Sequence, residues 1–217
     1  MRVLVIGGTG NISTGVVAAL LERDHQVVLF NRGQRPDLPP TGVQVIHGDR
    51  QAREDFEGRL RAEKFDAVID MISFDPDDAA SALRAFRGRV DHFVHCSTVL
   101  TYGPPFDGIN LDETAPLNGS SPYALGKTAA DALLLKAYEE DGFRVTILKP
   151  SYTYGKGMLG RQVPGYGIWI DRRDRVLGTD RENLRIQLFT LEGELIDIWL
   201  DHYKPMGIYV DALDRVY

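Results

Sequence analysis

The sequence predicts a doubly wound α/β fold, and three observations support this expectation. Short runs of apolar, often β-branched residues recur along the first 150 positions, with longer stretches of helical periodicity between most of them. The runs are apolar throughout rather than alternating, which is typical of parallel strands covered on both faces by crossover helices. A glycine-rich turn directly follows the first run and opens the first helical stretch.

The expected elements follow one another in a regular β–α rhythm. The six expected strands are Val3–Ile6, Val27–Phe30, Val43–Ile46, Ala67–Asp70, His92–Ser97 and Val145–Lys149. The expected helices are Ile12–Arg23, Ala52–Glu63, Asp77–Phe86 and Pro122–Glu140. This order predicts a parallel sheet with ligands at the carboxyl ends of its strands.

The rhythm breaks after Pro150. Residues 151–183 are rich in Gly, Arg and Asp and show no clear periodicity. The stretch Leu184–Leu200 alternates apolar and polar residues, which predicts a β-hairpin with its turn near Glu192-Gly193. We therefore expect one domain over residues 1–155 and a small substrate-side lobe over 156–217, and we leave open whether this C-terminal lobe is truncated.

Composition narrows the class of protein. Apolar residues make up 43% and charged residues 26% of the chain, as in ordinary globular proteins. The net charge of −6 gives no reason to expect a nucleic acid or an anionic membrane as partner, and no apolar run is long enough to span a bilayer. The single cysteine excludes an intrachain disulfide, so the cytoplasm is the expected location, and no residue spacing suggests a metal site.

The segment from Gly7 to Ser13 carries the first functional motif. Its glycines permit a positive φ and a close approach of the backbone to a pyrophosphate, which the N–H groups and dipole of the following helix attract. Ser13 stands at the third glycine position of the motif, where a small residue allows the helix to pack on the strand. We therefore predict a Rossmann-type dinucleotide site with contacts from Gly7, Thr9, Gly10, Asn11 and Ile12.

The tip of the second strand predicts the cofactor. An NAD site places a carboxylate there for the ribose hydroxyls, whereas this chain has Asn31 and Arg32. Asparagine removes the charge that would repel a 2′-phosphate, and Arg32 can bind that phosphate, so NADP(H) is expected, with NAD(H) as the alternative. Asp49 has two interpretations, a contact with the adenine amino group or a helix cap. Arg50 beside it is included among the expected cofactor contacts.

Tyr123 and Lys127 form the candidate catalytic pair. Ser121-Pro122 is typical of a helix start, and a spacing of four places both side chains on one helical face. Tyrosine has a pKa near 10, which a neighbouring ammonium lowers, and the lysine can also bind the nicotinamide ribose. Thr98, at the end of an expected central strand, can hydrogen-bond a substrate oxygen beside the tyrosine.

With these motifs in this order, the sequence resembles the extended short-chain dehydrogenase/reductases, the NAD-dependent epimerase/dehydratase group, over about residues 1–155. Phe65–Asp70 and Leu148–Gly155 add to the likeness, with Lys149 in the place of the family's arginine. The resemblance implies that Thr98, Tyr123 and Lys127 form the catalytic triad. It also implies that the residues after Pro150, and Pro150 itself, lie near the nicotinamide carboxamide.

One departure from the family narrows the chemistry. Its dehydratases carry an Asp-Glu pair directly after the serine or threonine, where this chain has Val99 and Leu100, so sugar dehydration by that mechanism is not expected. The resemblance implies an oxidoreductase or epimerase that acts on a sugar nucleotide or a related hydroxyl or carbonyl compound. The alternatives are a non-catalytic dinucleotide-binding or RNA-associated protein, or a degenerate member with neither activity. A homodimer paired through helices is a further expectation from the resemblance.

Overall fold

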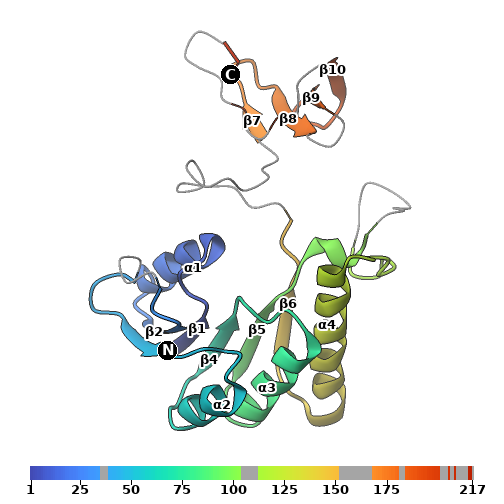
Figure 1. The fold of residues 1–217 in the computed structure, drawn as a ribbon. Helices are drawn as coiled ribbons and strands as arrows, with labels where there is room; N and C mark the ends of the chain where they lie inside the picture. Colours follow the sequence, from blue (N-terminus) through green and yellow to red (C-terminus); the bar gives the residue numbers. More distant parts are fainter. Residues whose placement is uncertain are drawn as a thin grey trace. The chain divides into compact units, whose positions relative to one another are not determined.

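A computed structural model describes residues 1–34, 39–103, 112–151, 168–180 and 184–200, together with residues 205, 208, 215 and 216. The chain divides into two compact units, Met1–Ser151 and Tyr152–Tyr217. Each unit has its own sheet and its own core, and each is described by itself (Figure 1).

The first unit is a parallel six-stranded sheet in the order β3-β2-β1-β4-β5-β6, flanked by helices, so the predicted doubly wound Rossmann-type fold is confirmed. The strands are β1 (Arg2–Ile6), β2 (Gln26–Asn31), β3 (Gln44–His47), β4 (Ala67–Asp70), β5 (His92–Cys96) and β6 (Val145–Leu148). The helices are α1 (Asn11–Leu21), α2 (Arg53–Arg61), α3 (Pro76–Phe86) and α4 (Pro122–Asp141), with a short 3₁₀ turn, η1 (Val99–Thr101). Each predicted element is present, with ends that differ by at most two residues.

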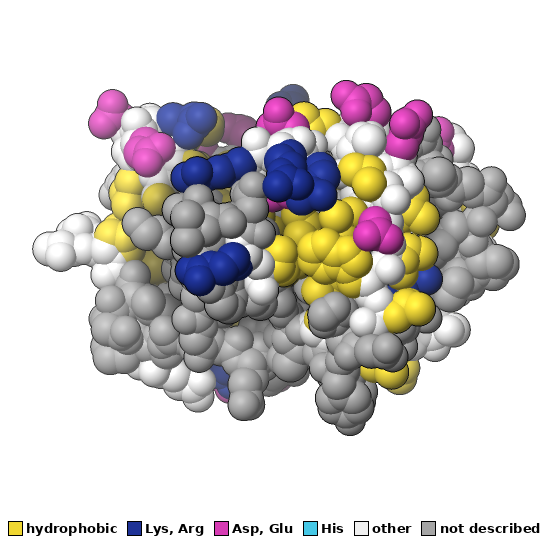
Figure 2. Space-filling model, turned by 90° about the horizontal axis from the view of Figure 1, so that it is seen from above, with side chains coloured by type: hydrophobic (Ala, Val, Ile, Leu, Met, Phe, Trp, Pro, Cys, Tyr) yellow, Lys and Arg dark blue, Asp and Glu magenta, His cyan; other side chains and the backbone are white. Residues whose placement is uncertain are grey.

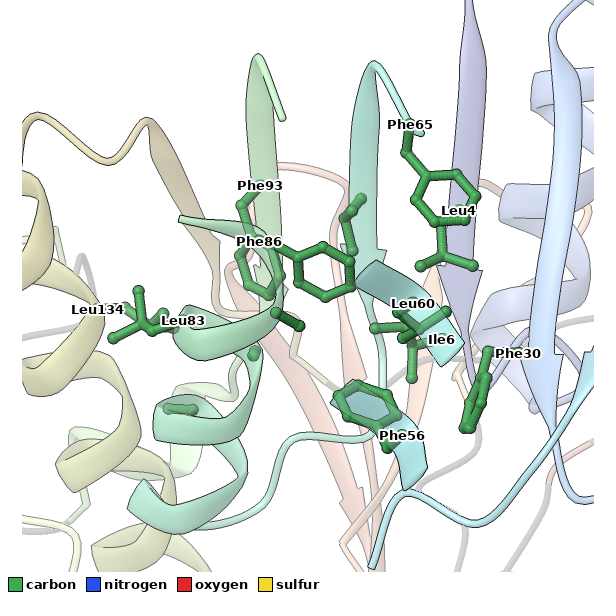
Figure 3. Close-up of a cluster of buried hydrophobic side chains, with 14 of the residues drawn as sticks. Leu4, Ile6, Phe30, Phe56, Leu60, Phe65, Leu83, Phe86, Phe93 and Leu134 are labelled. Carbon is green, nitrogen blue, oxygen red and sulfur yellow. The ribbon is translucent and has the colours of Figure 1, made fainter. Parts of the chain in front are cut away.

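Both faces of this sheet are apolar because both are covered. Successive residues of a strand point to opposite faces, so Leu4 and Ile6 belong to one core and Val5 to the other. Figure 3 shows the larger core, in which α2, α3 and α4 pack on the sheet and Phe30 meets Phe56 edge to face with ring centroids 5.1 Å apart. Helix α1 packs on the other face. The strands are therefore fixed from two sides, and their carboxyl ends form one edge.

Local capping sets where two of the helices begin. Asp75 accepts a hydrogen bond from the Asp78 N–H at 2.8 Å at the start of α3. Ser121 accepts one from the Ala124 N–H at 3.1 Å at the start of α4, where Pro122 occupies the first turn. Helix α4 ends at Gly142, whose φ of +68° provides the left-handed cap.

The second unit contains a four-stranded antiparallel sheet in the order β10-β9-β8-β7. The predicted hairpin is confirmed, and Gly193, with a φ of +91°, lies in its turn. The two strands before it were not predicted, because no periodicity marks them. The core contains Leu177, Ile186 and Leu188. The strands are β7 (Ile168–Ile170), β8 (Val176–Asp180), β9 (Arg185–Phe189) and β10 (Leu195–Trp199).

Among the helices in the described part of the chain, none combines the length and hydrophobicity needed to cross a membrane. Large hydrophobic side chains do occur at the surface, and Figure 2 shows one face on which hydrophobic and positively charged side chains lie next to each other. Single exposed apolar residues are normal in folded proteins, so only their grouping around a site carries information.

Candidate functional site

The turn between β1 and α1 lies tightly against the sheet. Gly7 has a φ of +82°, and a Cβ atom there would come within 2.6 Å of the Ile72 Cγ2 atom. A Cβ atom on Gly8 would come equally close to Leu29 Cδ2. Both positions therefore require glycine, and the turn brings the start of α1 directly over the carboxyl end of the sheet.

The N-terminus of α1 is suited to bind an anion. Gly10 precedes the helix without a side-chain cap, and the first turn contains no acidic residue. The first N–H groups of a helix have no partner within the helix, so those of Asn11 and Ile12, both exposed residues, can point at a phosphate. Ser13 is buried beneath them, as expected for a small residue that lets the helix pack on the strand. Thr9 lies half-buried in the same turn.

Asn31 and Arg32 lie at the carboxyl end of β2. Because β2 is the neighbour of β1 in the sheet, they lie beside the turn that follows β1. The Asn31 side-chain oxygen accepts a hydrogen bond from the Gly33 N–H at 2.9 Å. Its amide nitrogen is buried and has no hydrogen-bond partner among the residues that the structure describes. Arg32 is exposed. A buried donor without a partner is costly, so a ligand oxygen at this position would satisfy it.

Asp49 begins the turn that leads from β3 into α2. One of its carboxylate oxygens accepts a hydrogen bond from the Gln51 N–H at 2.9 Å, and its carbonyl accepts one from the Ala52 N–H. The side chain is exposed. Asp49 thus shapes this turn, and the predicted contact with adenine stays a prediction.

Arg50 is buried at the start of the turn that leads into α2. It is only 3% exposed, and its Nη1 atom lies 2.8 Å from the Asp70 carboxylate while its Nη2 donates to the Asp78 carbonyl at 2.7 Å. Its guanidinium also lies over the Phe56 ring, 5.0 Å from the centroid. Arg50 thus connects the end of β4 to α3, and its predicted contact with the cofactor stays a prediction.

The start of α4 presents Tyr123 at the surface and places Lys127 in the interior. Tyr123 is 42% exposed, whereas Lys127 is 1% exposed. The Lys127 Nζ donates a hydrogen bond to the Cys96 carbonyl at 2.5 Å and lies 4.9 Å from the centre of the Phe74 ring. Burial lowers the pKa of Lys127, and the negative charges of Asp70 and other neighbouring groups oppose that effect.

The expected lowering of the Tyr123 pKa by Lys127 is not present in this structure. Burial and the neighbouring Cys96 raise the pKa of Tyr123, while a hydrogen bond with Thr98 works in the opposite direction. The reason is geometric: the Lys127 ammonium points to the Cys96 carbonyl and lies 5.9 Å from the centre of the tyrosine ring. The structure therefore brings Thr98, Tyr123 and Lys127 together and leaves the phenol protonated at neutral pH.

Asp131, one helical turn after Lys127, was not predicted from the sequence and lies at the centre of a buried polar cluster. It accepts a hydrogen bond from the Ser97 hydroxyl at 2.8 Å and lies 3.0 Å from Lys149 Nζ and 3.2 Å from His95 Nε2. Burial works to raise the pKa of Asp131, but hydrogen bonds from His95, Ser97 and Lys149 outweigh it and lower the pKa. The spacing of four from Lys127 is the one sequence signal that could have found it.

Lys149 and Pro150 join the end of β6 to this cluster. The Lys149 Nζ donates a hydrogen bond to the Thr101 hydroxyl at 2.8 Å, and the Pro150 carbonyl accepts one from the Val99 N–H at 3.2 Å. The ends of β5 and β6 are therefore held together beside the catalytic candidates. The predicted segment Tyr152–Gly155 lies outside the described residues.

We expect the Asp131→Asn substitution to lower the free energy of unfolding at pH 7 by about 3 kcal/mol, because it removes the buried carboxylate that pairs with the half-buried Lys149 ammonium. The folded-state pKa of Asp131 is lowered, so its contribution is complete above about pH 4, the unfolded value, and disappears as the pH falls through the folded pKa. Urea unfolding of both proteins from pH 7 to pH 2 measures the difference.

The exposed Asp91→Asn substitution is the matched control and should change the stability by less than about 0.5 kcal/mol at any pH. A stability difference between wild type and Asp131→Asn that stays constant down to pH 2 would contradict the assigned charge of Asp131.

Comparison with known proteins agrees with this geometry. The model of the NAD dependent epimerase/dehydratase family matches residues 3–170. A 2′-dehydrokanamycin reductase of Streptomyces kanamyceticus is 36% identical over 173 residues, which are 78% of this chain and 48% of that protein. A UDP-glucose 4-epimerase of Lactobacillus helveticus is 27% identical over 169 residues, 69% of this chain and 51% of that protein. The chain thus spans about half the length of these relatives.

Solved structures show the same fold. The Thermus thermophilus UDP-glucose 4-epimerase, solved in complex with NAD, has a TM-score of 0.62 at 26% identity, over 69% of this chain and 54% of that chain. The Thermotoga maritima UDP-glucose 4-epimerase reaches 0.65 at 21% identity, over 76% and 58% of the two chains, which shows the fold alone. By the family model and these relatives, the chain belongs to the NAD-dependent epimerase/dehydratase family of extended short-chain dehydrogenases/reductases.

Proposed function

We propose that this chain binds NADP(H) in preference to NAD(H) and acts as an oxidoreductase or epimerase on a hydroxyl or carbonyl compound. The observation that carries the proposal is the tip of β2, where Asn31 offers an unpartnered buried amide donor and Arg32 an exposed guanidinium. A carboxylate at this place would repel a 2′-phosphate, whereas these two side chains attract it.

The residues along the sheet edge fit a dinucleotide. The turn at Gly7 and Gly8 has no room for side chains, and the uncapped start of α1 offers N–H groups and a positive dipole end to a pyrophosphate. Asp49 lies farther along the edge, near where an adenine would be bound. When bound, NADP(H) supplies or accepts the hydride. The protein supplies orientation and the proton.

Three residues of this chain carry the proton chemistry in the proposal. Tyr123 donates its phenolic proton to a carbonyl oxygen, since a phenol is protonated at neutral pH. Thr98 hydrogen-bonds Tyr123 and orients the same oxygen. Lys127, whose Nζ donates to the Cys96 carbonyl in this structure, would bind the nicotinamide ribose when the cofactor is present.

The substrate class in this proposal is a sugar nucleotide or a related hydroxyl or carbonyl compound. Its support is the names of the relatives, which include the reductase of a dehydrogenated aminoglycoside and epimerases of UDP-glucose. Dehydration is not proposed, because Val99 and Leu100 occupy the positions of the dehydratases' acidic pair. Pairing of two copies through helices that include α4 also stays a prediction.

A second candidate function is dinucleotide binding without turnover. The observation in its favour is that the Lys127 ammonium is turned away from the phenol of Tyr123 and bonded to a backbone carbonyl. A chloroplast stem-loop binding protein of Arabidopsis thaliana is 26% identical over 167 residues, so one relative of this chain is named for binding rather than for a reaction. Turnover distinguishes the two candidates.

We expect NADPH to bind more tightly than NADH, and Arg32→Ala to narrow the gap by about 10- to 150-fold, the value of a charge-assisted hydrogen bond. Calorimetric titration of both cofactors into wild type and variant measures the four affinities. Arg23→Ala, at the far end of α1, is a matched control and should leave the ratio unchanged. Equal affinities of NADPH and NADH for the wild type would rule out the proposed cofactor preference.

We expect Tyr123→Phe to reduce kcat by about 10²- to 10⁴-fold while leaving the cofactor affinity nearly unchanged, because the phenol supplies the proton. Lys127→Ala should weaken both, since Lys127 is assigned to the ribose as well. Steady-state kinetics with a carbonyl substrate and NADPH, together with the titration above, separate the two effects. Full activity of the Tyr123→Phe variant would exclude the proposed role of the tyrosine.

A further inference from the structure

Large hydrophobic side chains surround the proposed catalytic residues and remain open to solvent. Phe74, Leu100 and Leu117 are 46%, 44% and 48% exposed, and all three lie in the loops that follow β4 and β5. Grouped exposed apolar residues beside a site mark a surface for an apolar ligand more often than a random feature of the surface.

Phe74 lies directly beside the catalytic tyrosine. Its ring centroid is 6.2 Å from that of Tyr123, and the Lys127 ammonium lies 4.9 Å from the Phe74 ring on the buried side. The Gly126 position is also in close contact with the Phe74 backbone, since a Cβ there would come within 2.6 Å of the Phe74 carbonyl oxygen. The phenylalanine is therefore held next to α4 at a fixed place.

Leu100 and Leu117 are tied to the same place through η1. The Leu100 N–H donates to the Thr98 hydroxyl oxygen at 3.3 Å, so the backbone of Leu100 is bonded directly to the side chain of the proposed catalytic threonine. The backbone after Leu117 is bonded to η1 and to the residue that follows it, with the Gly119 N–H donating to the Thr101 carbonyl at 2.9 Å and the Asn118 N–H to the Tyr102 carbonyl at 2.7 Å. The apolar residues therefore belong to segments that flank Thr98 and Tyr123.

Two hydroxyl groups at the end of β5 already have partners inside the protein. The Ser97 hydroxyl donates to Asp131, and the Thr101 hydroxyl donates to the Thr98 carbonyl while it accepts from Lys149. These two hydroxyl protons are therefore engaged within the protein, whereas the exposed side chains of Phe74 and Leu100 offer apolar surface beside Tyr123 and Thr98.

We propose that the substrate carries an aliphatic or aromatic group next to its reacting carbonyl, and that Phe74 and Leu100 contact this group and select for it. The inference rests on the proposed function and narrows its substrate class. In the reduction, the carbonyl carbon accepts the hydride from NADPH and the carbonyl oxygen accepts the Tyr123 proton. The products are the alcohol and NADP⁺, and Tyr123 regains its proton from water.

The experiment measures binding, so it does not depend on turnover. Linear methyl ketones from 2-butanone to 2-octanone are titrated by calorimetry into the protein with saturating NADP⁺ and without it. We expect each added methylene to tighten binding by up to about fourfold, because burying a methylene is worth about 0.8 kcal/mol. Leu100→Ser and Phe74→Ser should each flatten this dependence on chain length.

Leu135→Ser is the matched control, since Leu135 is equally exposed on α4 but lies about 18 Å along the helix from Tyr123. It should leave the dependence unchanged. Affinities that do not rise with chain length, or that rise equally in wild type and both site variants, would overturn the inference. Failure of NADPH itself to bind, measured in the separate cofactor titration, would instead overturn the proposed function.

Discussion

The contact between the glycine turn and the sheet is the constraint on which the rest of the candidate site depends. Gly7 and Gly8 pack so closely on Ile72 and Leu29 that neither position has space for a Cβ atom. This packing fixes the uncapped start of α1 over the carboxyl edge of the sheet. Because the six strands are parallel, the tip of β2 and the loops after β4 and β5 reach the same edge. The sheet topology therefore places the start of α1, the tip of β2 and the candidate catalytic residues close to one another.

A second constraint is a group of buried charged side chains near the carboxyl ends of β5 and β6. Asp131 connects α4 to the ends of β5 and β6, through Ser97 and Lys149. Since Lys127 lies one turn earlier on the same helix, the position of its ammonium depends on this cluster. Arg50 has a similar supporting role between β4 and α3. Buried ion pairs contribute little net stability, but they restrict how elements can pack, and here they restrict the elements that carry the proposed chemistry.

The sequence predicted the parallel sheet because uninterrupted apolar strands and capping residues such as Ser121 are local signals. It also predicted which residues meet at the edge, since topology alone brings Asn31, Thr98 and Tyr123 there. It could not predict where the Lys127 ammonium points, because its hydrogen-bond partner, the Cys96 carbonyl, is distant in sequence. The burial of Arg50 could not be predicted for the same reason: its partners Asp70 and Asp78 are distant in sequence, and only the packed structure shows the guanidinium enclosed. The short strands β7 and β8 carry no periodicity that could reveal them.

The central claim, that the tight glycine turn creates a dinucleotide site, is tested most directly by titrating NADPH into wild type, Gly7→Ala and Gly15→Ala. A side chain at Gly7 must displace the turn from Ile72 at a φ of +82°, whereas one at Gly15 meets no atom within 4 Å. We expect wild type and Gly15→Ala to bind NADPH equally and Gly7→Ala to bind it at least about tenfold more weakly, a difference of about 1.4 kcal/mol. Equal binding by all three proteins, or no binding by the wild type, would contradict the account.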